Sequence, residues 1–243
     1  RWKDTGEHIS QTFGLADDEQ IIATYAFSDL KTPGEFLIAT DEGYIKRTEL
    51  SALQPSRTYK SRAMVYEKLK ADDAHVVNVT FMAKPEQTTV LLMSKLGLAL
   101  RFDIAEIPVN GARTTGVKSM NLGDDDCVTD MQLITDDDVV SLITQRGAFK
   151  KMKASELPVT SRARKGVMVL HALKNNPHEV VDFLKLQDDQ AIEVITDHRR
   201  MHDILPAEHP LSTRYSNGSF VVDIEKEGTP EILRIKPTSL TLS

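Results

Sequence analysis

The chain has little cysteine and no long apolar run. Among its 243 residues Cys127 is the single cysteine, which excludes an intramolecular disulfide framework and a zinc site built on cysteines. No stretch approaches the roughly 18 consecutive apolar residues of a membrane span. Residues 1–4 contain neither an initiator methionine nor the apolar core of a signal peptide, so we expect a cytosolic fragment of a longer protein.

Glycine, proline and net positive charge are also scarce. The 12 glycines and 10 prolines are too few for a fibrous or disordered chain, and 40% hydrophobic with 27% charged residues is typical of a globular protein. The 30 basic and 36 acidic residues give a net charge of −6, which excludes a uniformly basic surface. Any nucleic-acid binding must therefore come from local clusters of lysine and arginine.

A repeat of about fifty residues organises the chain. Gly43, Gly97, Gly147 and Arg199 follow one another at intervals of 54, 50 and 52 residues. Each follows an apolar stretch that ends in Ser/Thr-x-x, and each precedes a second stretch, which predicts four β-hairpins. The turn glycine predicts a positive φ, which costs other residues roughly 1 kcal/mol, so we expect an altered turn at Arg199.

Two further landmarks keep the same phase. A glycine-containing basic loop follows each hairpin, and its marker positions are Arg62, Gly116, Gly166 and Gly218. A β-branched strand comes next, and its copies begin at Val76, Val128, Val180 and Ile232, with an earlier copy at 21–24. Short helical turns are expected near 48–53 and 154–157. About four strands per unit predict an all-β, propeller-like disc of repeated blades.

We expect a single domain over residues 1–243. Residues 1–18 correspond to the back half of a unit, and 231–243 to a closing strand and tail. The whole units are 19–73, 74–126, 127–178 and 179–230. Whole and partial units together predict five blades.

Cations gather in the loops of the second landmark. No acidic residue occurs in 53–66, 107–123 or 157–176. The loop cations are Arg57, Lys60, Arg62, Arg113, Lys118, Arg162, Arg164 and Lys165, with Arg214 alone in the last unit. One basic loop by itself is more simply a solvated surface, but radial repetition would align several into a stripe that binds phosphates. Cations on the second hairpin strands are expected to widen it, namely Lys46, Arg47, Lys150 and Lys151.

Signals for sequence readout and for catalysis are missing. There is no recognition helix, zinc finger or aromatic RNA-binding motif, so contacts to phosphate should dominate. His198 and His202 are four residues apart but fall in a predicted hairpin, where this spacing does not bring two rings together. Cys127 has no partner signature for a nucleophile. We expect no catalytic residue, metal or cofactor in this chain.

Several segments resemble a known family. They are GYIKRTELS at 43–51, LALRFDIAEIPV at 98–109 with GVKSMNL at 116–122, and TQRGAFKK at 144–151 with TSRARKGV at 160–167. These resemble the C-terminal domain of bacterial type IIA topoisomerase A subunits, and within that family the topoisomerase IV group of Gram-positive bacteria. The resemblance implies a β-pinwheel, a disc whose blades exchange strands and whose outer rim binds duplex DNA.

The resemblance also implies what lies elsewhere. The family's catalytic tyrosine and the contacts between its subunits belong to upstream regions, so this fragment should not cleave DNA. ATP, magnesium and the B subunit of topoisomerase IV are expected only in the holoenzyme, in the bacterial cytoplasm at the nucleoid, and the isolated domain is expected to be monomeric. Gyrases carry a Gln-Arg-Arg-Gly-Gly-Lys-Gly box where this chain has SRTYKSRA at 56–63, and the lost glycine pair favours topoisomerase IV over tight DNA wrapping.

Three alternatives stay open at this point. One is the C-terminal domain from the A subunit of a variant gyrase. Another is a propeller that docks proteins through its acidic surface. A hydrolytic propeller would require a convergent acid/base cluster near the disc axis, with carboxylates in phase with the repeat.

Overall fold

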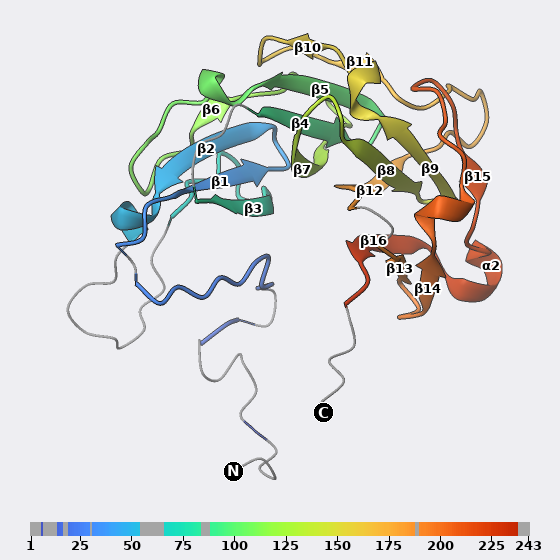
Figure 1. The fold of residues 1–243 in the computed structure, drawn as a ribbon, viewed down its shortest axis with the longest axis horizontal. Coiled ribbons are helices and arrows are strands. Elements are labelled where there is room, and N and C mark those ends of the chain that lie inside the picture. Colours follow the sequence, from blue (N-terminus) through green and yellow to red (C-terminus); the bar gives the residue numbers. More distant parts are fainter. Residues whose placement is uncertain are drawn as a thin grey trace.

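The computed structural model describes residues 6, 14–16, 19–29, 31–53, 66–83, 88–187 and 190–237. Within these residues four small β-sheets follow one another along an arc (Figure 1). The inner strands, β3 (Val76–Met82), β7 (Val128–Ile134), β12 (Val180–Lys185) and β16 (Pro230–Ile235), lie on the concave side of the arc (Figure 1). Two-residue strands lie along its convex side (Figure 1). No helix in this part of the chain is long and apolar enough to cross a membrane.

The strands of the four blades are as follows. The first sheet, in spatial order β3-β1-β2-β6, contains β3 (Val76–Met82), β1 (Glu35–Thr40), β2 (Tyr44–Glu49) and β6 (Val117–Lys118). The second contains β4 (Thr89–Ser94), β5 (Leu98–Asp103), β7 (Val128–Ile134), β10 (Val159–Thr160) and β11 (Val167–Met168). The third contains β8 (Val139–Thr144), β9 (Ala148–Lys153), β12 (Val180–Lys185) and β15 (Ser219–Phe220). The fourth contains β13 (Ile192–Thr196), β14 (Met201–Ile204) and β16 (Pro230–Ile235).

Short helices follow the hairpins. One 3-10 helix comes after each, and they are η1 (Leu50–Leu53), η2 (Ile104–Glu106), η3 (Ala154–Glu156) and η4 (Pro206–Glu208). A four-residue α-helix, α2, spans Ile224–Glu227. The helical turns expected near 48–53 and 154–157 are therefore confirmed.

Neighbouring blades exchange strands. The second strand of a hairpin pairs on its outer side with a short strand from the following unit: Tyr44 with Lys118, Leu98 with Met168, and Ala148 with Phe220. In the described part of the chain, β14 pairs only with β13. The expected β-pinwheel with strand exchange is confirmed for the first three blades.

Three of the four buried clusters in the described residues lie between blades, and the fourth, Phe36, Ile38 and Leu50, belongs to the first blade alone. Three clusters of buried side chains join the first blade to the second, the second to the third and the third to the fourth. Strand β4 shows the effect most clearly, because Val90 through Met93 are fully buried. A strand covered on both faces has no solvent-facing side, so its sequence is continuously apolar rather than alternating. Each blade therefore depends on its neighbours for a core.

The hairpin turns keep one backbone geometry with and without glycine. Gly43, Gly97 and Gly147 have φ values of 79°, 83° and 78°, as predicted. Arg199 occupies the same position with φ 56°, so the expected alteration of this turn is wrong. The hydrogen bonds of the turn hold Arg199 in the left-handed region, with its N–H 2.7 Å from the carbonyl of Thr196, at a cost of roughly 1 kcal/mol.

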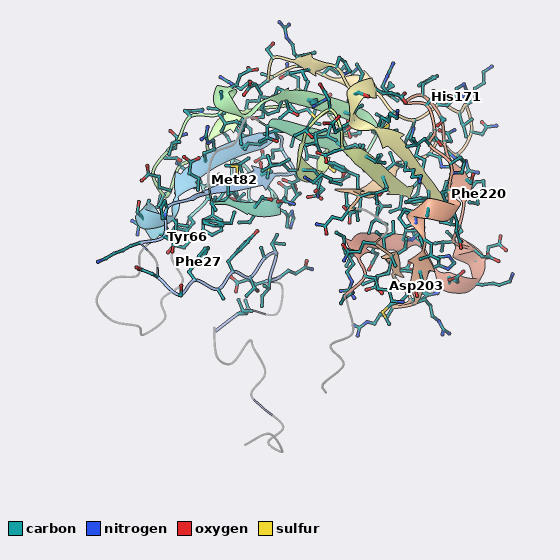
Figure 2. The ribbon with its side chains drawn as sticks, viewed as in Figure 1. Phe27, Tyr66, Met82, His171, Asp203 and Phe220 are labelled. Carbon is teal, nitrogen blue, oxygen red and sulfur yellow. The ribbon has the colours of Figure 1, made fainter. Side chains whose placement is uncertain are left out.

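The N-terminal partial unit differs from the expectation. No strand forms at 21–24, because the described residues contain no hairpin before β1 with which it could pair. Ile21 and Ile22 are exposed, whereas Phe27 packs against Phe36 and Phe81 beneath the first sheet (Figure 2). Five blades were expected from whole and partial units, and four sheets are present among the residues that the structure describes.

Candidate nucleic-acid interface

The rim consists of the exchanged strands β6, β11 and β15 and the loops that lead into them. Six predicted cations lie on this part of the structure. Arg113, Lys118, Arg164 and Lys165 are exposed, and Arg162 and Arg214 are half-buried. None of the six forms an ion pair with a carboxylate of the described residues. Their charge is therefore available to a ligand on the convex side of the arc.

Arg162 and Arg214 occupy equivalent positions and are held in the same way. The Nη1 atom of Arg162 donates to the carbonyl of Lys118 at 2.8 Å, and that of Arg214 donates to the carbonyl of Met168. These acceptors are the last residues of β6 and β11. Each arginine thus binds the short strand of the unit before its own, which fixes its guanidinium at the rim.

Glutamates of the 3-10 helices hold the same two loops through their backbone. Glu106 accepts from the N–H of Arg162 at 3.0 Å, and Glu156 accepts from the N–H of Arg214 at 2.6 Å. Sequence reasoning missed this role, although both glutamates follow their turn glycine by nine residues. That fixed interval was the available signal.

The cationic loops of the second and third units form one continuous surface. The N–H of Ala163 donates to the carbonyl of Ser119, and the side-chain amide of Asn121 donates to the carbonyl of Ala163, both at 2.7 Å. The N–H of Asn121 also donates to the carbonyl of Arg164 at 2.9 Å. Lys118, Arg162 and Arg164 are therefore brought together from two repeats.

A groove runs between β5 and the loop of the third unit. Its wall includes the hydroxyl side chains of Thr160 and Ser161 and the cations Arg164 and Lys165. Arg101 also borders the groove, but its guanidinium is occupied by Asp136 at 2.7 Å and by the carbonyls of Ala154 and Leu157. Hydroxyl donors next to unpaired cations suit an anionic ligand.

The hairpin cations do not widen the surface as expected. Lys46 and Lys150 are buried, with ammonium groups bonded to backbone carbonyls. Arg47 is 9% exposed and pairs with Glu35 at 2.7 Å, and Lys151 donates to the carbonyl of Pro206 at 2.6 Å. The second hairpin strand is covered by the exchanged strand and by the next unit, so its cations serve the fold.

Arg57, Lys60 and Arg62 lie in 54–65, outside the described residues. The other sequence-based site expectations concern histidines and metals. The Nδ1 atom of His202 lies 3.1 Å from the Oε2 atom of Glu227. Among the described side chains, no group of three or more His, Cys, Asp or Glu could hold a metal ion.

Repeat-phased carboxylates do occur on the inner strands, 52 residues apart, at Asp130 and Asp182. Desolvation raises the pKa of Asp130 to about 6, and desolvation followed by the charge of Asp130 raises the pKa of Asp182 well above its ordinary value. Asp130 accepts from the side chains of Asn78 and Gln132, while Asp182 accepts from the N–H groups of Phe183 and Leu233. These bonds join inner strands of adjacent blades, which gives the carboxylates a structural role.

A family model described as "DNA gyrase C-terminal domain, beta-propeller" matches residues 34–80, 88–135 and 138–187. The chain is 36% identical over 246 residues to the A subunit of DNA topoisomerase 4 from Streptococcus pyogenes serotype M1, covering 92% of this chain and 29% of that protein. It is 35% identical over 232 residues to the corresponding protein of Bacillus subtilis (strain 168), covering 94% of this chain and 28% of that protein. The chain therefore spans less than a third of these relatives.

Solved structures agree with the sequence relatives. A crystal structure of the C-terminal domain of DNA topoisomerase IV matches with a TM-score of 0.86 and 37% identity, covering 96% of this chain and 71% of that chain. A DNA gyrase A C-terminal domain matches with a TM-score of 0.78 and 19% identity, covering 96% and 75%. The second likeness concerns the fold alone.

Proposed function

Because the chain belongs to the family of C-terminal domains found in the A subunits of gyrase and topoisomerase IV, we propose that it binds duplex DNA along its convex rim without reading base sequence. One observation carries the proposal: the loops of two repeats unite Lys118, Arg162 and Arg164 on one surface on which no described carboxylate pairs with them. The chain as a whole is acidic, so this local excess of positive charge is what a polyanion would meet.

The proposed contacts are the rim cations alone. They are Arg113, Lys118, Arg162, Arg164, Lys165 and Arg214, together with Arg57, Lys60 and Arg62, which lie outside the described residues. Each phosphate that such a contact neutralises releases counterions and adds about −0.9 to the slope of log affinity against log salt. Binding should therefore be strong at low salt and weak near physiological salt.

Base readout has no structural support in the part of the chain described. The α-helix there, α2, has four residues, which is too short to read a major groove. Backbone contacts along a curved rim favour bent DNA, and bending over several blades costs a few kcal/mol. Modest bending and similar affinity for all sequences are expected.

In the longer protein this domain would be a non-catalytic accessory. It would help an enzyme of the topoisomerase IV type to capture a transported duplex and to choose among crossed and supercoiled substrates. The B subunit, ATP and magnesium would act in that holoenzyme, at the bacterial nucleoid.

The test removes two exposed rim charges that form no ion pair with a described carboxylate. Arg164→Gln with Lys165→Gln should weaken binding of a 30-base-pair duplex about ten-fold at low salt and make the salt slope about two units shallower, measured by fluorescence anisotropy. The control is Lys226→Gln with Lys236→Gln, which removes the same charge from residues paired with Asp223 and Asp203. Equal affinities of the two double variants would reject the rim as the DNA-binding surface.

A further inference from the structure

One position of the hairpin repeat carries a buried lysine in two units and not in the others. Three residues after the turn marker stand Lys46, Leu100, Lys150 and His202. Both lysines are among the largest fully buried side chains of the described structure. A buried ammonium is stable only when its donors are bonded, so the partners of these two groups show their role.

Lys150 binds carbonyls from two separate segments. Its Nζ donates to Val169 at 2.6 Å, just after β11 of its own unit. The carbonyls of Thr213, Arg214 and Ser216, all in the rim loop of the following unit, lie 3.3, 2.6 and 2.9 Å from the same Nζ. The three N–H donors of the ammonium are therefore shared among four carbonyls. The same loop carries the rim cation Arg214, so the ammonium lies directly beneath it.

Lys46 lies at the equivalent position two junctions earlier, between the first and second units. Its Nζ donates to the carbonyl of Tyr66 in its own unit, and to that of Thr114 in the next unit at 3.2 Å. Thr114 follows the rim cation Arg113. The carboxylate of Glu67 lies 3.2 Å from the same Nζ, and desolvation raises the pKa of this glutamate.

We propose that Lys46 and Lys150 are positioning residues for the rim, each fixing from inside the fold the loop that carries the rim cation of the following unit. This rests on the proposed function for its consequence in DNA binding, but the positioning itself is independent of DNA. Both lysines are buried beneath the rim, so they would not contact a ligand bound there. They act through the carbonyls of the loop.

The physical reason is mutual repulsion among carbonyl oxygens. The carbonyl oxygens of Thr213, Arg214 and Ser216 point at one buried site, where they repel one another and have lost their hydrogen bonds to water. The ammonium of Lys150 between them offsets both costs, because it donates charge-assisted hydrogen bonds.

At the junction between the second and third units Leu100 occupies the position. There no lysine is present, and the loop is held by Glu106, as Glu156 holds the loop of the following unit, and by the amide of Asn121. This loop therefore serves as an internal reference.

The first experiment measures hydrogen exchange by mass spectrometry. Lys150→Met should accelerate exchange of residues 213–218 at least ten-fold and leave 161–166 unchanged. Leu100→Met, a volume-conserving change at the equivalent position, should alter neither segment. Lys46→Met should give the same result in 111–116. Unchanged exchange of 213–218 in folded Lys150→Met would overturn the proposal.

The second experiment tests the coupling to DNA by anisotropy. Lys150→Met should weaken DNA binding a few-fold, and adding Arg214→Gln should weaken it no further, because the lysine acts through that arginine. In contrast, combining Lys150→Met with Arg164→Gln and Lys165→Gln should weaken DNA binding by the full product of the separate fold-changes. Full additivity with Arg214→Gln would refute the positioning role. Absence of DNA binding by the unaltered protein would reject the proposed function and leave the exchange result to decide positioning.

A measurement on the unaltered protein covers the case in which the methionine variants do not fold. Desolvation lowers the pKa of Lys150 to about 8, against the opposing charge of Glu156 and with the aid of Arg214, the two charged groups that bear on it. Exchange of 213–218 relative to 161–166 should therefore rise as pH passes from 7 to 9. A constant ratio across that range would contradict the proposal.

Discussion

The side-chain amide of Asn78 donates to the carboxylate of Asp130 at 2.7 Å, joining inner strands of the first and second blades across 52 residues of sequence. Asp182 continues this arrangement on the third blade by accepting from the N–H of Leu233 on the fourth, at 2.8 Å. Polar groups thus connect the inner strands of the first two blades and those of the last two described blades. The two carboxylates repel each other when both are ionised.

Asp130→Asn should stabilise the protein at neutral pH. Burial raises the pKa of Asp130 from 3.8 to about 6, so between these pH values the folded state holds a proton that the unfolded state releases. At pH 7 the folded state instead carries a buried charge. The stabilisation that this bound proton gives the folded state is complete below pH 4 and is lost as pH rises through 6. The asparagine keeps an acceptor for Asn78 without the charge, and a gain of about 1 to 2 kcal/mol at pH 7 is expected.

Urea denaturation between pH 4 and pH 8 checks this prediction. The variant should also show a flatter pH dependence between 4 and 6 than the unaltered protein. Asp137→Asn, in an exposed turn, is the control for a charge change. A loss of stability at pH 7 would contradict the prediction.

Arg101→Met should destabilise the second and third blades together. The Nη1 atom of this buried arginine donates to the carbonyls of Ala154 and Leu157, at the two ends of η3, and pairs with Asp136. Methionine fills similar space but leaves those carbonyls without a donor, at a cost of about 2 to 4 kcal/mol. Denaturant unfolding measures the loss, and Lys153→Met on the exposed end of β9 should stay within about 0.5 kcal/mol.

Gly166→Ala should disrupt strand exchange between the second and third units. This glycine has φ 88°, and a Cβ atom would lie 2.4 Å from the carbonyl oxygen of Ala99 on β5. Backbone cannot move aside as a flexible side chain can, so a loss of at least about 2 kcal/mol is expected. Gly111→Ala, where a Cβ would meet nothing within 4 Å, is the matched control. Comparable melting temperatures for the two variants would show that the exchange tolerates a shift of β11.

Glu106→Gln should strengthen DNA binding. The amide oxygen keeps the bond to the N–H of Arg162, while a negative charge disappears from beside the rim cations. At low salt an increase in affinity of about two- to three-fold is expected, and it should vanish above roughly 0.3 M salt because of screening. Glu208→Gln, at the equivalent position in the fourth unit, bonds no described rim loop and should leave anisotropy titrations unchanged.

The local part of the fold could be predicted from the sequence. The predicted positions and phase of the turns at Gly43, Gly97 and Gly147, and of the strands after them, are confirmed. They could be predicted because each depends on neighbours within a few residues. Strand β15 pairs with β9, where Phe220 lies opposite Ala148, 72 residues earlier in the chain. Residue patterns alone do not specify a pairing at that separation. The resemblance to a family with exchanged strands supplied that expectation.

The site was predicted less completely. Lys118 lies on the short strand β6 and Lys150 lies on the hairpin strand β9. Residue type alone does not distinguish the exposed lysine from the buried one. Burial of Lys150 depends on four carbonyls contributed by two distant segments, which only the folded arrangement brings together. Arg199 is a local case that residue preference also misses, because the hydrogen bonds of its turn keep a backbone conformation that arginine disfavours.

Strand exchange makes the repeat in the chain and the blade in space two different objects. Excising the fifty residues of one repeat would leave its neighbour's hairpin without an outer strand, and the following outer strand would have to find a new edge. Gain or loss of whole blades during evolution therefore requires that any repeat's short strand fit any other repeat's hairpin. The equivalent pairing of Tyr44 with Lys118, Leu98 with Met168 and Ala148 with Phe220 meets that requirement, because each joins the residue after a turn marker to the second residue of a short strand. The exchange that binds the blades together therefore also leaves their number free to vary.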